Sequence, residues 1–319
     1  MNKSESGPIL ITGATGFVGR YLAEALQQRW PDRQLILTDR VSISTPQGQV
    51  LELEIGDSDA VTDLFRHAQP AVVVHLAAIA AVTSSFSDPR VAWAVNTVGT
   101  LNVVLAIQAE APDCHMLFVS SAEVYGRSSF SGTPVSETTL LLPANPYAAT
   151  KAAADIMVQE AAGRGLRATI IRPFNHTGPG QADIFAIPTF CSQIARIEKG
   201  QQAPVIKVGE LRDERDLMDV SDVVDMYVQI ITHIDTIENG LVLNAASGRA
   251  RRIGGILEHL LSLTSKEISI EVDPSRLRAT RVPRVVGDAS LALQHLGWRA
   301  STPIEDTLSR TLDFWRRAT

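Results

Sequence analysis

Short apolar runs alternate with longer segments of helical periodicity through the first half of the chain. The apolar runs are rich in Val, Ile and Leu, and they predict buried strands at residues 9–12, 35–38, 71–76, 116–120 and 168–172. Between them, the spacing of apolar positions predicts helices at 17–29, 59–68, 90–110 and 147–162. Strands that are apolar on both faces and alternate with helices are typical of a parallel sheet covered on both sides. The expected fold class is therefore α/β, with a doubly wound sheet of the Rossmann type.

The regular alternation ends near residue 173. Prolines then separate shorter elements, which predicts a smaller, mixed α/β lobe with loops. A helix at 220–233 and a strand at 241–244 are expected to return the chain to the first lobe. We therefore predict a dinucleotide-binding domain of residues 1–173 plus about 217–246, and a second lobe of about 174–216 and 247–319.

Composition narrows the class of protein. A chain of 319 residues that is 45% hydrophobic can bury a large core. The net charge of −6, without a basic tract, argues against a nucleic-acid partner. No uninterrupted apolar stretch reaches about 18 residues, so no membrane span is expected. Cys114 and Cys191 are the only cysteines, too few for a disulfide framework, and no metal site is expected. A cytoplasmic location fits these features.

Glycines cluster where the first predicted strand leads into the first predicted helix. Gly13 allows a tight turn, Gly16 lets the backbone approach a pyrophosphate, and Gly19 permits close helix–strand packing. The free N–H groups and positive dipole at a helix N-terminus stabilise phosphates. The pattern predicts a dinucleotide site at Gly13, Thr15, Gly16, Phe17, Val18 and Gly19.

Two opposed charges end the second predicted strand. Asp39 lies 20 residues after Gly19, where a carboxylate accepts hydrogen bonds from ribose hydroxyls and repels a 2′-phosphate. Arg40 follows, and an arginine there can pair with that phosphate. The balance favours NAD, with NADP as the alternative. Asp57 is a further candidate contact, to the adenine, although a solvated turn aspartate explains it nearly as well.

An acid–base pair lies in the predicted helix that begins at Asn145 and Pro146. Tyr147 and Lys151 are four residues apart, which places both on one helix face. A nearby ammonium favours tyrosinate, so Lys151 is expected to lower the pKa of Tyr147. Ser121 follows a strand at the sheet edge where ligands bind. The three side chains predict a chemical site beside the glycine loop.

Five motifs resemble the extended short-chain dehydrogenase/reductase family across essentially the whole chain: residues 12–19, 75–78, 96–100, 120–126 and 147–151. The resemblance implies a catalytic triad of Ser121, Tyr147 and Lys151. Tyr147 would exchange a proton with the sugar oxygen while the nicotinamide exchanges hydride, and Lys151 would also hold the nicotinamide ribose. By the same resemblance, further cofactor contacts are Leu76, Ala77, Ala78, Asn96 and Pro173.

The second half resembles the GDP-mannose 4,6-dehydratase group and, more strongly, its reductase relatives that form GDP-D-rhamnose. Residues 172–181, 205–209 and 215–220 carry this resemblance. It implies that Arg215 and Arg278 bind the nucleotide diphosphate, a role that suits the fork of donors on a guanidinium group. The expected substrate contacts are Ser84, Ser85, Phe86, Asn175, Phe185, Lys207, Arg215 and Arg278.

Three reactions remain open within this resemblance. A reductase would deliver hydride to the C4 ketone of GDP-4-keto-6-deoxy-D-mannose, with Tyr147 as proton donor. A GDP-mannose 4,6-dehydratase needs a further acid and base for elimination, for which Glu123 is the candidate. A nucleotide-sugar 4-epimerase would retain oxidised NAD. The loop after Asp39 lacks the arginine-rich pattern of the dehydratases, which favours the reductase. A binding protein without turnover is disfavoured by the intact triad.

Resemblance also predicts the assembly. In relatives, the helices that correspond to 90–110 and 147–162 pair across a two-fold axis. A homodimer through a four-helix bundle is therefore expected.

Overall fold

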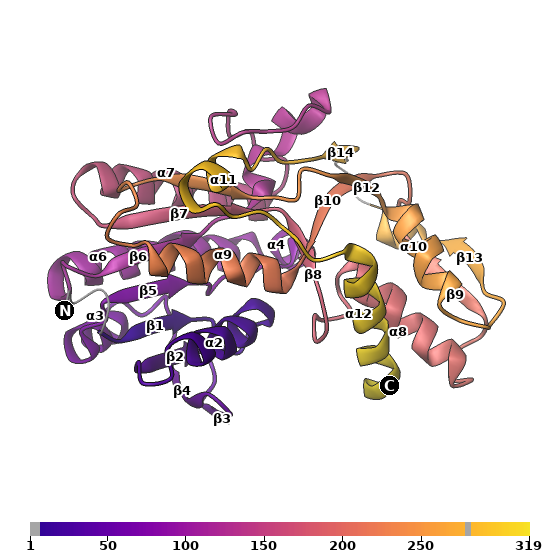
Figure 1. Cartoon of the computed structure of the whole chain (residues 1–319), viewed down its shortest axis with the longest axis horizontal. Helices are drawn as coiled ribbons and strands as arrows, with labels where there is room; N and C mark the ends of the chain where they lie inside the picture. Colours follow the sequence, from indigo (N-terminus) through magenta and orange to yellow (C-terminus); the bar gives the residue numbers. More distant parts are fainter. Residues whose placement is uncertain (1–6, 278–281) are drawn as a thin grey trace.

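The computed structural model describes residues 7–277 and 282–319 and contains a large sheet flanked by helices (Figure 1). The spatial order of its strands is β11-β7-β6-β5-β1-β2-β4-β3. Neighbouring strands run parallel, except that β3 is antiparallel to β4. The strands are β1 (Ile9–Thr12), β2 (Leu35–Asp39), β3 (Ile43–Thr45), β4 (Gly48–Glu52), β5 (Val72–His75), β6 (His115–Val119), β7 (Ala168–Pro173) and β11 (Val242–Ala245).

Helices cover both faces of this sheet, because alternate strand residues on each face are apolar. One core cluster joins the sheet to α2 (Phe17–Arg29), α9 (Val220–Thr232) and α11 (Ser290–Leu296). The other joins it to α3 (Ser58–Ala68), α6 (Thr100–Glu110) and α7 (Pro146–Gly163). The expected Rossmann-type α/β fold is confirmed.

A second group of elements lies at the right of Figure 1. Its helices α8 (Ala186–Glu198), α10 (Ile253–Ser262) and α12 (Ile304–Ala318) share a separate core cluster. Strand β10 pairs with three other strands, and β9 pairs with β13. These strands are β8 (Asn175–Thr177), β9 (Val205–Val208), β10 (Glu214–Asp219), β12 (Ala250–Arg252), β13 (Ser269–Val272) and β14 (Arg284–Val285). The boundaries of the two lobes stay a prediction.

Two local features differ from the periodicity. The β3–β4 hairpin was not predicted, because Val50 is the only buried residue of β4 and no apolar run marks it. The helix predicted at 90–110 is divided into α5 (Pro89–Trp93), a π-helical segment η1 (Ala94–Gly99) and α6. Among the described residues, Pro89–Glu110 is also the one helix long and apolar enough to cross a membrane by length and composition. Since 44% of its apolar window is buried, it also fits a core helix.

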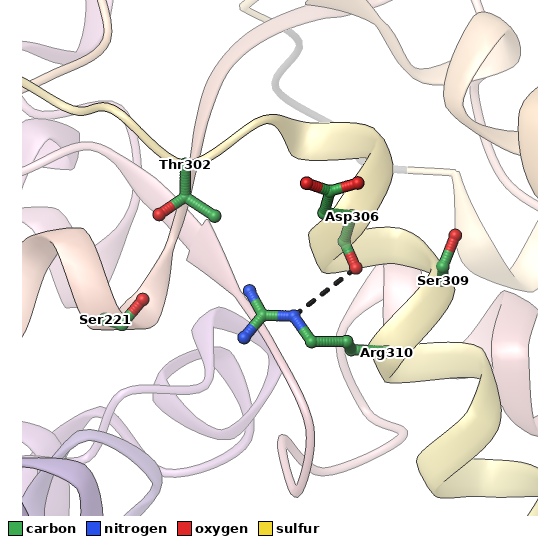
Figure 2. Close-up of a pocket in the computed structure, with 5 residues that line it drawn as sticks. All are labelled: Ser221, Thr302, Asp306, Ser309 and Arg310. Carbon is green, nitrogen blue, oxygen red and sulfur yellow. Dashed lines mark hydrogen bonds between the residues drawn. The ribbon is translucent and has the colours of Figure 1, made fainter.

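Polar contacts join α12 to the start of α9, around a pocket of about 540 Å³ (Figure 2). The Arg310 guanidinium lies 2.6 Å from the buried carboxylate of Asp219, which also accepts from the Thr307 hydroxyl at 2.7 Å. Within α12, Arg310 Nε also donates to the Asp306 carbonyl one turn earlier, as Figure 2 shows. Because Asp219 also caps α9, these groups act as a structural joint between the two groups of elements.

Candidate active site

The glycine loop is built for close backbone approach. Gly13 has φ +72°, and a Cβ atom there would lie 2.9 Å from the Ala77 nitrogen. A Cβ atom at Gly19 would lie 2.4 Å from the Gly13 carbonyl oxygen. No side chain caps the start of α2 at Gly16, so first-turn N–H groups stay available for phosphate. These residues fit the pyrophosphate of a dinucleotide.

Asp39 is fixed against this loop. Its Oδ2 accepts hydrogen bonds from the Thr15 backbone nitrogen at 3.0 Å and hydroxyl at 2.6 Å. Arg40, next along the chain, is exposed. Asp57 accepts from the backbone N–H groups of Asp59 and Ala60, so its carboxylate caps α3. Its predicted contact with adenine stays a prediction, as do the other individual cofactor contacts.

A buried hydrogen-bond chain, which the sequence did not predict, holds the loop after β5 that lies against Gly13. The Ala77 N–H donates to the Thr12 hydroxyl, which lies 2.8 Å from His75 Nδ1. His75 Nε2 lies 3.1 Å from the Thr100 hydroxyl, which donates to the Asn96 carbonyl. Because the Thr100 hydroxyl gives its proton to Asn96, Nε2 must carry a proton, and in a neutral ring Nδ1 then accepts from the Thr12 hydroxyl. Burial, with the charge of Lys151, lowers the pKa of His75 to about 3, so the ring stays neutral.

Asn96 connects the same loop to α7. Its side-chain oxygen accepts from the Ile79 N–H at 2.7 Å, and its amide donates to the Thr150 hydroxyl at 2.9 Å. Thr150 lies in α7, between Tyr147 and Lys151 in sequence. The predicted cofactor-supporting asparagine thus couples the loop beside Gly13 to the helix that carries the candidate acid–base pair.

Tyr147 and Ser121 meet at the carboxyl edge of the sheet. Burial raises the pKa of Tyr147 to about 12, against the opposing effect of its hydrogen bond to Ser121, and the charge of Glu123 raises it further. The expected lowering by Lys151 is therefore wrong for this structure, because desolvation of the phenol is the largest effect. A phenol with a raised pKa is fully protonated at neutral pH, which suits a proton donor.

Lys151 is buried one helical turn from Tyr147. Its Nζ donates to the Val119 carbonyl at 2.5 Å and lies 4.5 Å from the centre of the Phe118 ring. Burial lowers the pKa of Lys151 to about 8, while the charge of Asp155 opposes that shift. The ammonium is thus held beside the end of β6, two residues before Ser121 in the sequence.

The start of α7 is fixed by two side chains from other elements. The Tyr147 backbone N–H donates a hydrogen bond of 3.1 Å to the hydroxyl of Ser85, a residue that is fully buried. Asn145 caps the helix and donates from its amide to Glu123 at 3.0 Å. Ser85, predicted as a substrate contact, therefore holds the backbone of the candidate acid. Glu123 lies beside the acid, as a residue with a role in elimination would need.

A buried ion pair, which the sequence also did not predict, holds α7 against β7. Arg172 Nε and Nη2 each lie 2.9 Å from the Asp155 carboxylate, and both side chains are nearly inaccessible. Arg172 also donates to the Tyr125 hydroxyl at 3.1 Å, and Tyr125 donates to Asn244 at 2.7 Å. The network ties α7 to β7, β11 and the segment after Ser121.

The predicted substrate residues lie in several different parts of the structure. Ser84, Phe86 and Asn175 are exposed, and Arg215 lies 3.2 Å from Asp213. Lys207 lines a pocket of about 580 Å³ between α8 and the β9–β13 pair. Phe185 immediately precedes α8. Arg278 lies outside the described residues, and the substrate roles of all these residues stay predictions.

A pH profile tests the state of Lys151. Turnover is expected to fall as pH rises through about 8, because the ammonium gives up its proton at that lowered pKa. Tyr147, with a pKa of about 12, keeps its proton over this pH range. The fall in turnover, the alkaline limb of the profile, is therefore assigned to Lys151. The measurement is kcat between about pH 6 and 10. A flat profile in that range contradicts the assignment, and Lys151→Arg should remove the limb from whatever activity remains.

Known proteins resemble the chain over nearly its full length. The family model for GDP-mannose 4,6-dehydratase matches residues 10–311. GDP-6-deoxy-D-mannose reductase from Pseudomonas aeruginosa is 33% identical over 96% of both chains. GDP-6-deoxy-D-talose 4-dehydrogenase from Aggregatibacter actinomycetemcomitans is 27% identical over 91% of both.

A solved structure agrees with these sequence matches. The structure of RMD from Pseudomonas aeruginosa complexed with NADPH covers 98% of this chain and 100% of its own, with 31% identity and a TM-score of 0.86. The chain therefore belongs to the GDP-mannose 4,6-dehydratase family of extended short-chain dehydrogenase/reductases, a group of NAD(P)-dependent enzymes that act on nucleotide sugars.

Proposed function

We propose that the protein reduces the C4 ketone of GDP-4-keto-6-deoxy-D-mannose to give GDP-D-rhamnose. The observation that carries this proposal is that the Tyr147 phenol meets Ser121 at the carboxyl edge of the sheet, one helical turn from Lys151 on α7. Bound NAD(P)H supplies hydride. Ser121 polarises the ketone by donating a hydrogen bond to its oxygen, and Tyr147 gives its proton to that oxygen. The 33% identity to GDP-6-deoxy-D-mannose reductase supports the same direction of reaction.

The test supplies GDP-4-keto-6-deoxy-D-mannose with NADH or NADPH and follows loss of the reduced-cofactor absorbance. Oxidation of one cofactor is expected, with formation of a 4-hydroxy sugar. No oxidation of either cofactor by folded protein contradicts the proposal. Formation of a 4-keto sugar from GDP-mannose, without net cofactor consumption, would instead establish the dehydratase.

Glu123→Gln separates the two reactions. The substitution preserves the shape of the side chain beside Asn145 but removes its acid–base capacity. Ketone reduction should stay within a few-fold of wild type, whereas elimination would be lost. The measurement is the rate of Glu123→Gln relative to wild type, once with the ketone and once with GDP-mannose as substrate. A 4-epimerase remains the third candidate, identified by inversion at C4 with the cofactor staying oxidised.

The cofactor preference is proposed from two neighbouring charges. Asp39 favours NAD, and exposed Arg40 is free to approach a 2′-phosphate. NAD is the proposed preference, with NADP as the alternative that the NADPH complex of RMD supports. The ratio of kcat/KM for NADH and NADPH, in wild type and Arg40→Ala, measures the contribution of the Arg40 charge.

A cytoplasmic homodimer is proposed through α6 and α7. Exposed apolar side chains lie on these helices and on the π-helical segment before α6: Val98, Leu101, Leu105 and Ile156. Sedimentation velocity at micromolar concentration is expected to give a dimer. A charge at the centre of the surface, as in Leu105→Glu, should give monomers, because an unpaired buried charge opposes association. A wild-type monomer contradicts the proposal.

A further inference from the structure

A second arginine stands directly across from Arg215. Strands β10 and β12 are antiparallel, and their register pairs Arg215 with Arg251. Residues paired in this way project to the same face of the sheet, with Cβ atoms about 5 Å apart. Like charges placed opposite each other destabilise a sheet. The arrangement therefore calls for an anion that the two guanidinium groups share.

The two arginines differ in their protein partners. Arg215 contacts Asp213 at 3.2 Å and donates to the Glu214 carbonyl at 2.8 Å. Arg251 is half-buried, and its side chain makes one hydrogen bond to the described residues, a long one of 3.5 Å to the Leu217 carbonyl. Within residues 7–277 and 282–319, no carboxylate lies at ion-pair distance from Arg251. Its charge is thus partly desolvated and has no counter-ion in the part of the chain that the structure describes.

The same face carries a third donor. Strand side chains alternate with a period of two, so Arg215 and Leu217 project to one face of β10. Leu217 pairs in turn with Asn175 on the parallel strand β8. Asn175 is exposed, and its amide lies on the same face of the sheet as the two arginines. Among the residues that the structure describes, this sheet face therefore presents two cations and an amide beside the carboxylate of Asp213.

Asp216 holds the two strands together despite this repulsion. Its buried carboxylate projects to the opposite face and accepts hydrogen bonds from the N–H and hydroxyl of Ser247, at 2.8 and 2.6 Å. The N–H groups of Gly248 and Gly287 donate to it at 2.9 and 3.2 Å. These contacts fix the loop before β12 and the segment after β14 against β10, so the arginine pair is preorganised.

We propose that Arg251 binds the substrate diphosphate together with Arg215. This proposal rests on the proposed nucleotide-sugar substrate and adds a residue to its binding site. The guanidinium forks of these two paired residues can match the oxygens of two linked phosphates, and a bound anion would remove the repulsion between the arginines. Arg251 is thus a determinant of affinity for nucleoside diphosphates.

The test is calorimetric binding of GDP, GMP and guanosine to wild type and Arg251→Gln. A hydrogen bond to a charged group contributes enough that GDP affinity should fall about 10- to 100-fold. GMP affinity should fall less, and guanosine affinity should not change. Arg251→Lys keeps the charge without the fork of donors, so its affinity for GDP should lie between those of wild type and Arg251→Gln. In turnover, KM for the sugar nucleotide should rise while kcat stays within a few-fold.

Arg252→Gln is the matched control. Arg252 is the next residue, projects to the other face of β12, and pairs with Glu258 at 2.6 Å on the surface. Its GDP affinity should equal that of wild type. Unchanged GDP affinity in folded Arg251→Gln overturns the role of Arg251 alone. Wild-type protein that binds neither GDP nor other nucleoside diphosphates overturns the proposed function and, with it, this proposal.

Discussion

Replacement of Tyr147 by phenylalanine is expected to lower kcat for ketone reduction about 100- to 10,000-fold, the range over which a positioned general acid contributes. The variant removes only the hydroxyl that bonds to Ser121. The N–H of residue 147 keeps its bond to Ser85, and Asn145 still caps α7. Cofactor affinity, measured by quenching of protein fluorescence, should therefore stay within a few-fold of wild type.

Tyr227→Phe provides the control for loss of a buried phenol. The Tyr227 hydroxyl is buried and has no hydrogen-bond partner among the described residues. Its removal should leave kcat nearly unchanged. If Tyr147→Phe keeps more than about a tenth of wild-type kcat, or if both variants lose activity equally, Tyr147 is not the general acid.

Replacement of Asp155 by asparagine is expected to lower the free energy of unfolding by about 3–5 kcal/mol, because it leaves the Arg172 charge buried without its partner. Both side chains of the pair are almost completely buried, at 0% and 3% exposure. Urea denaturation followed by circular dichroism measures the change. A loss below about 1 kcal/mol, typical of exposed pairs, would contradict the account.

Two further variants sharpen this test. Glu160 and Arg164 form an exposed ion pair at the end of the same helix, so Glu160→Gln should leave the unfolding transition nearly unchanged. The double variant Asp155→Leu with Arg172→Met removes both charges and fills the space with apolar groups. It should recover part of the stability lost in Asp155→Asn, since the cost comes from the unpaired charge.

Local patterns were sufficient for the glycine loop and for most elements around the large sheet. The run 9–12, the glycines after it and the helix that follows are adjacent in sequence, and β1 and α2 begin and end as predicted. Pairing across the fold was not accessible in this way. Asp155 meets Arg172, and Ser85 meets the Tyr147 N–H, only after helices and strands pack.

The acid–base site shows the same division. The spacing of Tyr147 and Lys151 correctly predicted a shared helix, but the direction of the tyrosine pKa was wrong. Periodicity carries no measure of how completely a phenol is removed from water, and that desolvation outweighs the other effects on Tyr147. The neutral tautomer of His75 likewise follows from the hydroxyl groups that surround it.

Isotope transfer tests the proposed reduction most directly. Purified protein is incubated with GDP-4-keto-6-deoxy-D-mannose and NADH or NADPH deuterated at C4 of the nicotinamide, and the product is analysed by NMR and mass spectrometry. A reductase with Tyr147 as proton donor predicts one deuterium on C4 of the sugar, a proton on the new hydroxyl, and a rhamno configuration. Recovery of unlabelled ketone with unoxidised cofactor, from folded protein, would contradict the account.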